Sequence, residues 1–122
     1  MLRTFAVLFG VFMLVFGTMG FIPMVKEGDF LFKIFHVNFF LNLTYIGTGF
    51  ISLLCGLNNT AAARLFFQAF GIFFGLLTIL GIYYGSEPVF GLLANNWADT
   101  LLHLGIALLS IYLGFRVKFR AV

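Results

Sequence analysis

The residues best able to do chemistry in this sequence lie in one short stretch, NNWADTLLHLG, at positions 95–105. Asp99 and His103 are four residues apart, and Asn96 precedes Asp99 by three, so a helix would place all three near one face. A carboxylate beside an imidazole can hold a small polar ligand or contribute to a metal site. Because only 9% of the residues are charged, this group at the start of a hydrophobic run is the main candidate for function.

The composition is typical of an integral membrane protein. Of the 122 residues, 62% are hydrophobic and 20% are aromatic, including 19 Phe. A soluble domain of this size buries only about 60–70% of the surface that its unfolded chain exposes, which is too little to hide so much apolar surface. The net charge of +3 comes from scattered residues rather than a basic face, so we expect no nucleic-acid partner.

Four apolar segments are long enough to cross a bilayer, which requires about 20 residues per helix. They cover residues 5–25, 36–57, 65–84 and 98–115, and Gly, Pro, Asn or charged residues punctuate the connections. Helices are expected because lipid offers no hydrogen-bond partner to an open strand edge. The sequence therefore predicts an all-α membrane protein, a compact bundle of four transmembrane helices in a single domain over residues 1–122.

The Lys and Arg residues near the span ends predict the orientation of the chain. Two of them, Lys26 and Lys33, lie on one side of the membrane. The five on the other side are Arg3, Arg64, Arg116, Lys118 and Arg120, three of them in a basic tail at 116–122. We therefore predict a multi-pass protein of the bacterial inner (plasma) membrane with both termini in the cytoplasm. The acidic residues and the polar stretch would then lie at the outer side.

The chain also resembles itself at an offset of 58 residues, which suggests two tandem helical hairpins, at about 1–57 and about 58–115. The offset pairs Asn38 with Asn96 and Ser52 with Ser110. It also pairs residues of the first span with residues of the third, namely Phe9, Phe12, Phe16 and Gly17 with Phe67, Phe70, Phe74 and Gly75. Two hairpins of the same orientation form a parallel repeat, whose pseudo-two-fold axis runs along the membrane normal.

The second and fourth spans each carry a stripe that is polar at the outer end and small further in. Steps of three and four residues place each stripe on one helix face, and small residues let helices approach closely in lipid. We expect the two stripes to face each other. The candidate ligand-binding residues are Asn38, Asn42, Tyr45, Asn96, Asp99 and His103. The expected helix-packing residues are Gly49, Ser52, Gly56, Ala107, Ser110 and Gly114.

The polar residues allow several interpretations. In a purely structural one, Asp99 caps the fourth helix, and His103 and Asn96 bond across to Tyr45, Asn42 or Asn38. In a second, the group binds a small polar ligand, an ion or a lipid headgroup. A metal site would draw on His36, His103, Asp99 and Glu87, although two histidines on separate helices are a weak signal. Catalysis is disfavoured, because Ser110 lies about 10 Å along the helix from His103.

The motif Asn96-Trp-Ala-Asp99-Thr-Leu-Leu-His103, followed by Ala107, resembles a bacterial family of small four-helix membrane proteins that is known only as a domain of unknown function. The second span keeps Asn38, Asn42 and Gly49 of the related pattern but has Leu41 and Tyr45 where the family tends to have His. The resemblance implies the four-helix topology and the shared stripe. It implies no activity, and the missing histidines count against a metal or proton-relay role.

The function predicted from the sequence is that of a non-enzymatic membrane protein whose outer-facing polar pocket binds a small ligand or lipid headgroup. One alternative is a small transporter or channel subunit that oligomerises, and another is a metal- or redox-associated component of a membrane enzyme. The sequence indicates no cofactor. The expected partners are membrane lipid and either a second copy of the chain or another membrane protein. The single cysteine, Cys55, excludes an internal disulfide.

Overall fold

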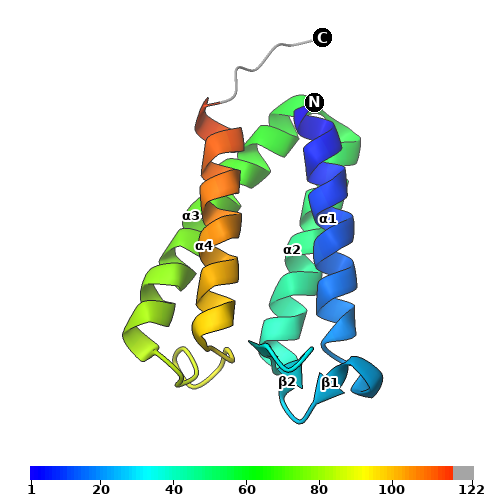
Figure 1. Cartoon of the computed structure of the whole chain (residues 1–122). Helices are drawn as coiled ribbons and strands as arrows, with labels where there is room; N and C mark the ends of the chain where they lie inside the picture. The colour runs from blue at the N-terminus through cyan, green and yellow to red at the C-terminus, as the bar shows by residue number, and fades with distance from the viewer. Residues whose placement is uncertain (117–122) are drawn as a thin grey trace.

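The computed structural model describes residues 1–116 and contains four long helices (Figure 1). They are α1 (Leu2–Met19), α2 (Phe39–Asn58), α3 (Thr60–Tyr84) and α4 (Trp97–Ile111), with a π-helical extension over Tyr112–Arg116. All four, α4 together with its extension, are long and apolar enough to cross a membrane. The predicted fold, a compact all-α bundle of four membrane helices, is confirmed. Lys118 and Arg120 of the basic tail lie outside the described residues.

The connection between α1 and α2 contains structure that the sequence analysis did not predict. A 3-10 turn at Pro23–Val25 leads into an antiparallel sheet of three two-residue strands. These strands are β1 (Lys26–Glu27), β2 (Phe30–Leu31) and β3 (Phe35–His36). Strands this short leave no alternating pattern in the sequence. We call this end of the bundle the sheet end, and the opposite end, where α1 begins and Arg116 lies, the terminal end (Figure 1).

Asparagine side chains determine where three of the helices begin. The Oδ1 atoms of Asn38, Asn59 and Asn96 accept backbone N–H groups three residues further along, at 2.9, 2.7 and 2.9 Å. Such N-caps stabilise a helix by about 1 kcal/mol. The prediction that Asp99 caps the fourth helix is therefore wrong. Asn96 is the cap, and Asp99 is the third residue of α4.

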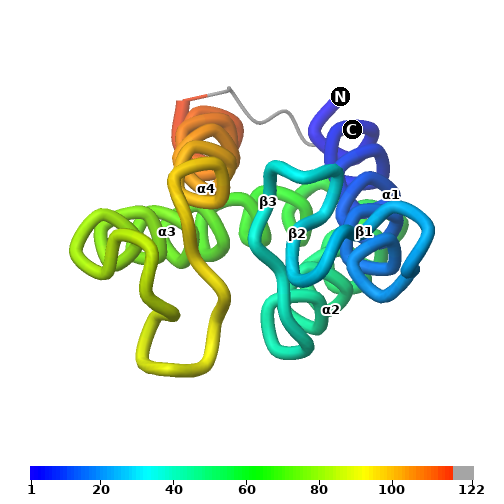
Figure 2. The backbone as a smooth tube through the Cα atoms, turned by 60° about the horizontal axis from the view of Figure 1, so that its bottom comes forward, coloured from blue at the N-terminus to red at the C-terminus, as the bar shows by residue number. Residues whose placement is uncertain are grey.

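The helices pack mainly as two pairs, α1 with α2 and α3 with α4 (Figures 1 and 2). A Cβ atom on Gly10 would lie only 2.7 Å from the carbonyl oxygen of Gly49, so the backbones of α1 and α2 touch there. Further along, the Ser52 hydroxyl donates to the carbonyl oxygen of Ala6 at 2.7 Å. The small-residue stripe of α2 therefore faces α1.

The second pair makes the same kind of contact. A Cβ atom on Gly71 would lie 3.0 Å from the backbone nitrogen of Ile111, and one on Gly114 would lie 2.7 Å from that of Gln68. The stripe of α4 thus faces α3, and Ala107 and Ser110 are buried with it. The prediction that the stripes of α2 and α4 face each other is wrong for their small residues, because helical spacing shows which face is small but not which helix covers it. At the polar ends of the stripes, Tyr45 of α2 and His103 of α4 do meet.

Equivalent contacts also change the offset that relates the first and third helices. Gly10 packs on Leu53 of α2, and Gly71 packs on Ile111 of α4. Leu53 and Ile111 are 58 positions apart, as predicted, but Gly10 and Gly71 are 61 positions apart. All six buried residues of α1 coincide with buried residues of α3 at this second offset. The pairing of α1 with α3 at 58 is therefore wrong, while the tandem repeat itself stays a prediction that these contacts support.

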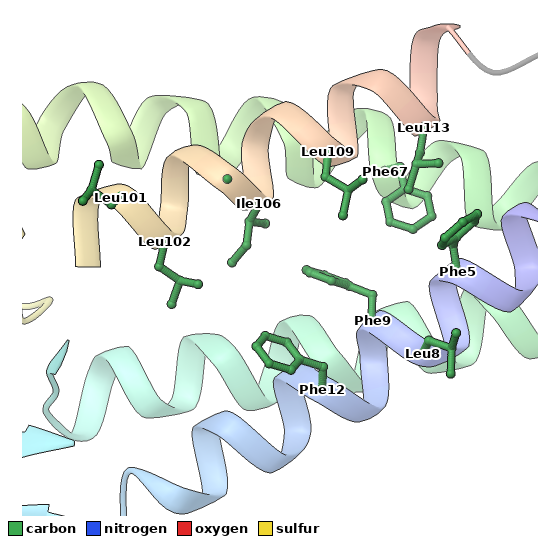
Figure 3. A pocket seen from close by; sticks show the side chains of 11 residues that line it. Phe5, Leu8, Phe9, Phe12, Phe67, Leu101, Leu102, Ile106, Leu109 and Leu113 are labelled. Carbon is green, nitrogen blue, oxygen red and sulfur yellow. The ribbon is translucent and has the colours of Figure 1, made fainter. Parts of the chain in front are cut away.

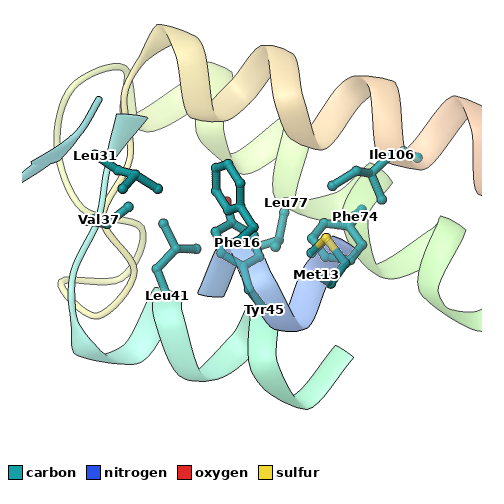
Figure 4. Packing of buried hydrophobic residues seen from close by; sticks show 11 residues of the cluster. Met13, Phe16, Leu31, Val37, Leu41, Tyr45, Phe74, Leu77 and Ile106 are labelled. Atoms are coloured by element: carbon teal, nitrogen blue, oxygen red, sulfur yellow. The ribbon is translucent and has the colours of Figure 1, made fainter. Parts of the chain in front are cut away.

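Large side chains fill the space between the two helix pairs toward the sheet end (Figure 4). The ring of Phe16 packs edge-on against Tyr45, with ring centroids 5.4 Å apart. Met13 and Phe74 are fully buried beside them. Because this layer is aromatic and aliphatic, the polar residues that lie among it must find partners within a small space.

Candidate functional site: a buried polar cluster

A hydrogen bond between Tyr45 and His103 joins the two helix pairs. The Tyr45 hydroxyl of α2 lies 2.8 Å from Nε2 of His103 on α4. The imidazole also contacts the ring of Phe74 on α3, with ring centroids 5.6 Å apart. His103 is therefore held by side chains from two other helices, and its orientation is fixed in the core.

Asp99 lies one helical turn before His103 and is completely buried. Nδ1 of His103 has no hydrogen-bond partner within residues 1–116. The two carboxyl oxygens have none that is short and well aligned, although the backbone N–H groups of His36 and Asn96 are close enough to stabilise the charge of the carboxyl. The electrostatic neighbours of the carboxyl are the backbone amides of His36 and Asn96, together with the Tyr45 side chain. We call Tyr45, Asp99 and His103 the polar cluster. Its chemistry is that of a carboxyl and an imidazole nitrogen with unused hydrogen-bonding capacity.

Asn38 and Asn96 lie at the sheet end, where α2 and α4 begin, and form equivalent hydrogen bonds to the opposite helix pair. Nδ2 of Asn38 donates to the carbonyl oxygen of Leu92 at 2.8 Å, and Nδ2 of Asn96 donates to that of Ile34 at 2.9 Å. Both the donors and the acceptors are 58 positions apart. Each asparagine therefore caps its own helix and fastens the connecting loop of the other pair.

Asn42, another candidate residue, turns away from the polar cluster. Its Nδ2 donates to the carbonyl oxygen of Gly20 at 2.9 Å, at the end of α1. Gly20 has no room for a Cβ atom, because the Asn42 amide occupies that space. Asn42 therefore holds α1 against α2.

Asn95, which was not among the candidate residues, holds α3 against α4 in the second pair. Its Nδ2 donates to the carbonyl oxygens of Gly81 and Gly85 at 3.1 and 2.9 Å, at the end of α3. Its only signal in the sequence was its place beside the capping Asn96.

His36 is near the cluster but bound elsewhere. Its ring stacks on Phe30, with ring centroids 5.1 Å apart, and its Nδ1 lies 3.5 Å from the carbonyl oxygen of Asn95. Among residues 1–116 no three His, Cys, Asp or Glu side chains lie close enough to hold a metal ion. The weak metal candidates His36, His103 and Asp99 are thus not gathered into a ligand set in this part of the chain.

The polar cluster is closed to the surroundings. Tyr45, Asp99 and His103 are exposed by only 0, 0 and 3%. An open apolar groove of about 480 Å³ lies between α1 and α4, but none of the six candidate ligand-binding residues lines it. Any ligand of the cluster must therefore be small, and it must enter through motion of the loops or helices.

Comparison with known proteins gives a family but no function. One family model, described as a domain of unknown function (DUF4383), matches residues 3–116. No curated protein and no solved structure matches the chain.

Proposed function

The chain belongs to this family of unknown function, and we propose that it is a non-enzymatic multi-pass membrane protein that binds a small polar ligand between Asp99 and His103. The observation that supports the proposal is that Nδ1 has no partner among residues 1–116, while the two buried carboxyl oxygens have only weak contacts to the backbone N–H groups of His36 and Asn96. Buried polar groups are nearly always hydrogen-bonded, and an ionised carboxyl in a membrane costs several kcal/mol unless it is paired or hydrated. A bound ligand would meet both requirements.

The hydrogen bond to Tyr45 constrains the chemistry of that ligand. When the Tyr45 hydroxyl donates to Nε2, the neutral imidazole of His103 carries its hydrogen on Nδ1. A ligand between the two groups would then accept from Nδ1 and donate to Asp99. Water, a small alcohol and a small amine can all do both, whereas a bulky phospholipid headgroup does not suit so closed a site.

The rest of the core supports binding rather than transport or catalysis. Toward the terminal end the buried side chains are apolar apart from those of Ser52 and Ser110. The hydrophobic members there are Leu2, Ala6, Ala63, Phe66, Phe67 and Leu113. A permeation path would require polar groups at that depth. The hydroxyl of Ser52 already donates to a backbone carbonyl, which leaves it unsuited to act as a nucleophile.

We also propose that the terminal end faces the cytoplasm of a bacterial inner membrane. Arg3, Arg64 and Arg116 lie at or near that end, whereas Lys26 and Lys33 lie at the sheet end. Cytoplasmic segments carry the excess of Lys and Arg in most membrane proteins. The polar cluster would then lie in the outer half of the membrane.

Native mass spectrometry of the gently solubilised protein tests the binding proposal. We expect the wild type to retain a small non-covalent mass that is lost in both Asp99→Asn and His103→Ala. Ser110→Ala is the matched control, because Ser110 is also buried on α4 and its Oγ also lacks a partner. The control should keep the bound mass.

The proposal would be contradicted if none of the four proteins carried a mass beyond that of its polypeptide, provided that thermal unfolding shows the variants to be folded. The cluster would then serve only to join the two helix pairs. A bound mass that disappears in Ser110→Ala but persists in Asp99→Asn would place the ligand elsewhere on α4.

A further inference from the structure

An apolar groove runs along the membrane-facing side of α1 and α4, apart from the polar cluster (Figure 3). Phe9 and Phe12 of α1 point across it toward Leu102 and Ile106 of α4. Its volume of about 480 Å³ falls within the range of roughly 300–1,000 Å³ that is usual for small-molecule sites. Every side chain that lines it is apolar.

The groove has the shape and position of a site for one acyl chain. Its α4 wall extends from Leu101 to Leu113, which corresponds to about 18 Å of helix. One leaflet contributes roughly 15 Å of hydrocarbon to a bilayer. Both walls belong to helices that are long and apolar enough to cross the membrane, so lipid tails surround the groove. Leu8 and Leu101 are each 61% exposed, which leaves the groove open to those tails.

The terminal end of the groove is positively charged. Arg116 lies three residues beyond Leu113, the last residue that lines the groove, in the π-helical extension. Arg116 is exposed. The acids among residues 1–116 belong to the sheet-end loops and the first turn of α4 and are Glu27, Asp29, Glu87 and Asp99. The charge at the terminal end therefore favours an anion, such as a lipid phosphate.

From this geometry we infer that the groove between α1 and α4 is a binding site for an anionic phospholipid. One acyl chain lies between Phe9 and Phe12 on one side and Leu102 and Ile106 on the other. The phosphate lies at the terminal end, beside Arg116. The site is independent of the polar cluster and does not rest on the function proposed for it.

Two equivalent glycines provide a matched pair of variants for the test. Gly105 lines the groove, and a Cβ atom there would meet no other atom within 4 Å. Gly105→Leu should therefore fill the groove without disturbing helix packing. Gly47 lies 58 positions earlier on α2, and a Cβ atom there also meets nothing within 4 Å. Gly47→Leu is the control for the same change outside the groove.

The experiment adds dioleoylphosphatidylglycerol or dioleoylphosphatidylcholine to the purified protein in detergent and counts bound lipids by native mass spectrometry. We expect at least tenfold tighter retention of one phosphatidylglycerol than of phosphatidylcholine. That single lipid should be lost in Gly105→Leu and kept in Gly47→Leu. Arg116→Gln should remove the preference for the anionic lipid while leaving some retention of either one.

Retention of phosphatidylglycerol by Gly105→Leu at the wild-type level would overturn the inference. Equal retention of the two lipids by the wild type would overturn the assignment to an anionic lipid. A protein dimer that Gly105→Leu abolishes would show that a second copy of the chain occupies the groove instead. Leu8→Trp fills the groove from α1 at an exposed position and should also lose the lipid, so a folding defect in one variant cannot decide the outcome.

Discussion

At the scale of single residues, His103 is the point where three of the four helices meet. It belongs to α4, accepts or donates a hydrogen bond at Tyr45 of α2 and contacts the ring of Phe74 on α3. The polar group of such a contact is costly to leave unpaired when it is buried. His103 should therefore contribute to stability through Nε2 and to binding through Nδ1.

Tyr45→Phe should lower the free energy of unfolding by about 1–3 kcal/mol, because it leaves Nε2 of His103 buried without its partner. Equilibrium unfolding in mixed micelles measures this difference. Tyr83→Phe removes a hydroxyl from a side chain that is 81% exposed and should change the free energy of unfolding by less than about 0.5 kcal/mol. Equal effects of the two changes would show that the buried hydrogen bond adds no stability.

Part of this site could be predicted from the sequence, and the rest could not. The contact between Tyr45 and His103 was one of the pairings that the structural interpretation allowed, because both lie on matching stripes. The direction of the Asn42 amide toward Gly20 and the role of Asn95 depend on which carbonyl groups a neighbouring helix presents. No local pattern in the sequence encodes that information.

At the scale of helices and loops, asparagine caps and glycine contacts position the elements. Asn38 and Asn96 each have two roles, because the side chain caps one helix and also hydrogen-bonds to the loop of the other pair. Asn59 only caps α3. This difference allows the two tasks to be separated experimentally.

Asn38→Ala should destabilise the protein by about 2 kcal/mol, as the sum of about 1 for the lost cap and about 1 for the lost bond to Leu92. Asn59→Ala should cost only about 1 kcal/mol, because only a cap is lost. Thermal or denaturant unfolding of both variants in the same detergent gives the comparison. A larger loss for Asn59→Ala would show that the cross-molecule bond of Asn38 contributes nothing.

Two glycine substitutions should change stability in opposite directions. Gly10→Ala should destabilise, because its Cβ atom would lie 2.7 Å from the carbonyl oxygen of Gly49 and force α1 away from α2. Gly47→Ala should stabilise by up to about 1 kcal/mol, because alanine favours the helix and the new methyl group meets nothing. Unfolding midpoints measured side by side decide the signs. Stabilisation by both changes would argue against the close approach of α1 and α2 at Gly10.

The four helices could be predicted from the sequence because apolar runs of bilayer length admit little else. Their ends were less predictable. The first helix stops at Met19 rather than near residue 25, where the predicted span ended, because the 3-10 turn and the sheet follow it. At the start of α4, Asn96 and Asp99 were both possible caps, and only the three-dimensional arrangement decides between them.

At the scale of the whole molecule, the distribution of charge suggests how the bundle lies in its membrane. The arginines among residues 1–116 gather toward the terminal end, and the exposed acids lie in the loops of the sheet end. The four helices among residues 1–116 bring Leu2 and Arg116 to the same end of the bundle. The separation of arginines from acids could be predicted from the sequence, because charge near span ends is a local property, whereas the orientation in the membrane stays a prediction.

Cysteine labelling in intact bacterial cells tests the orientation. In a Cys55→Ala background, Glu87→Cys at the exposed sheet-end loop should react with a membrane-impermeant maleimide. Asn58→Cys, at the exposed end of α2 near the terminal end, should react only after the cells are permeabilised. The reverse pattern would place the termini outside the cell.

The central claim is that a small ligand bridges Asp99 and Nδ1 of His103. Nitrogen-15 NMR of the His103 ring in lipid bilayers, with His36→Gln to leave one histidine, measures it most directly. We predict that both ring nitrogens show hydrogen-bonded chemical shifts, and that Asp99→Asn changes the Nδ1 shift while the Nε2 shift set by Tyr45 stays constant. A wild-type Nδ1 with the shift of a nitrogen free of hydrogen bonds would contradict the claim and leave the cluster as a structural contact between the two helix pairs.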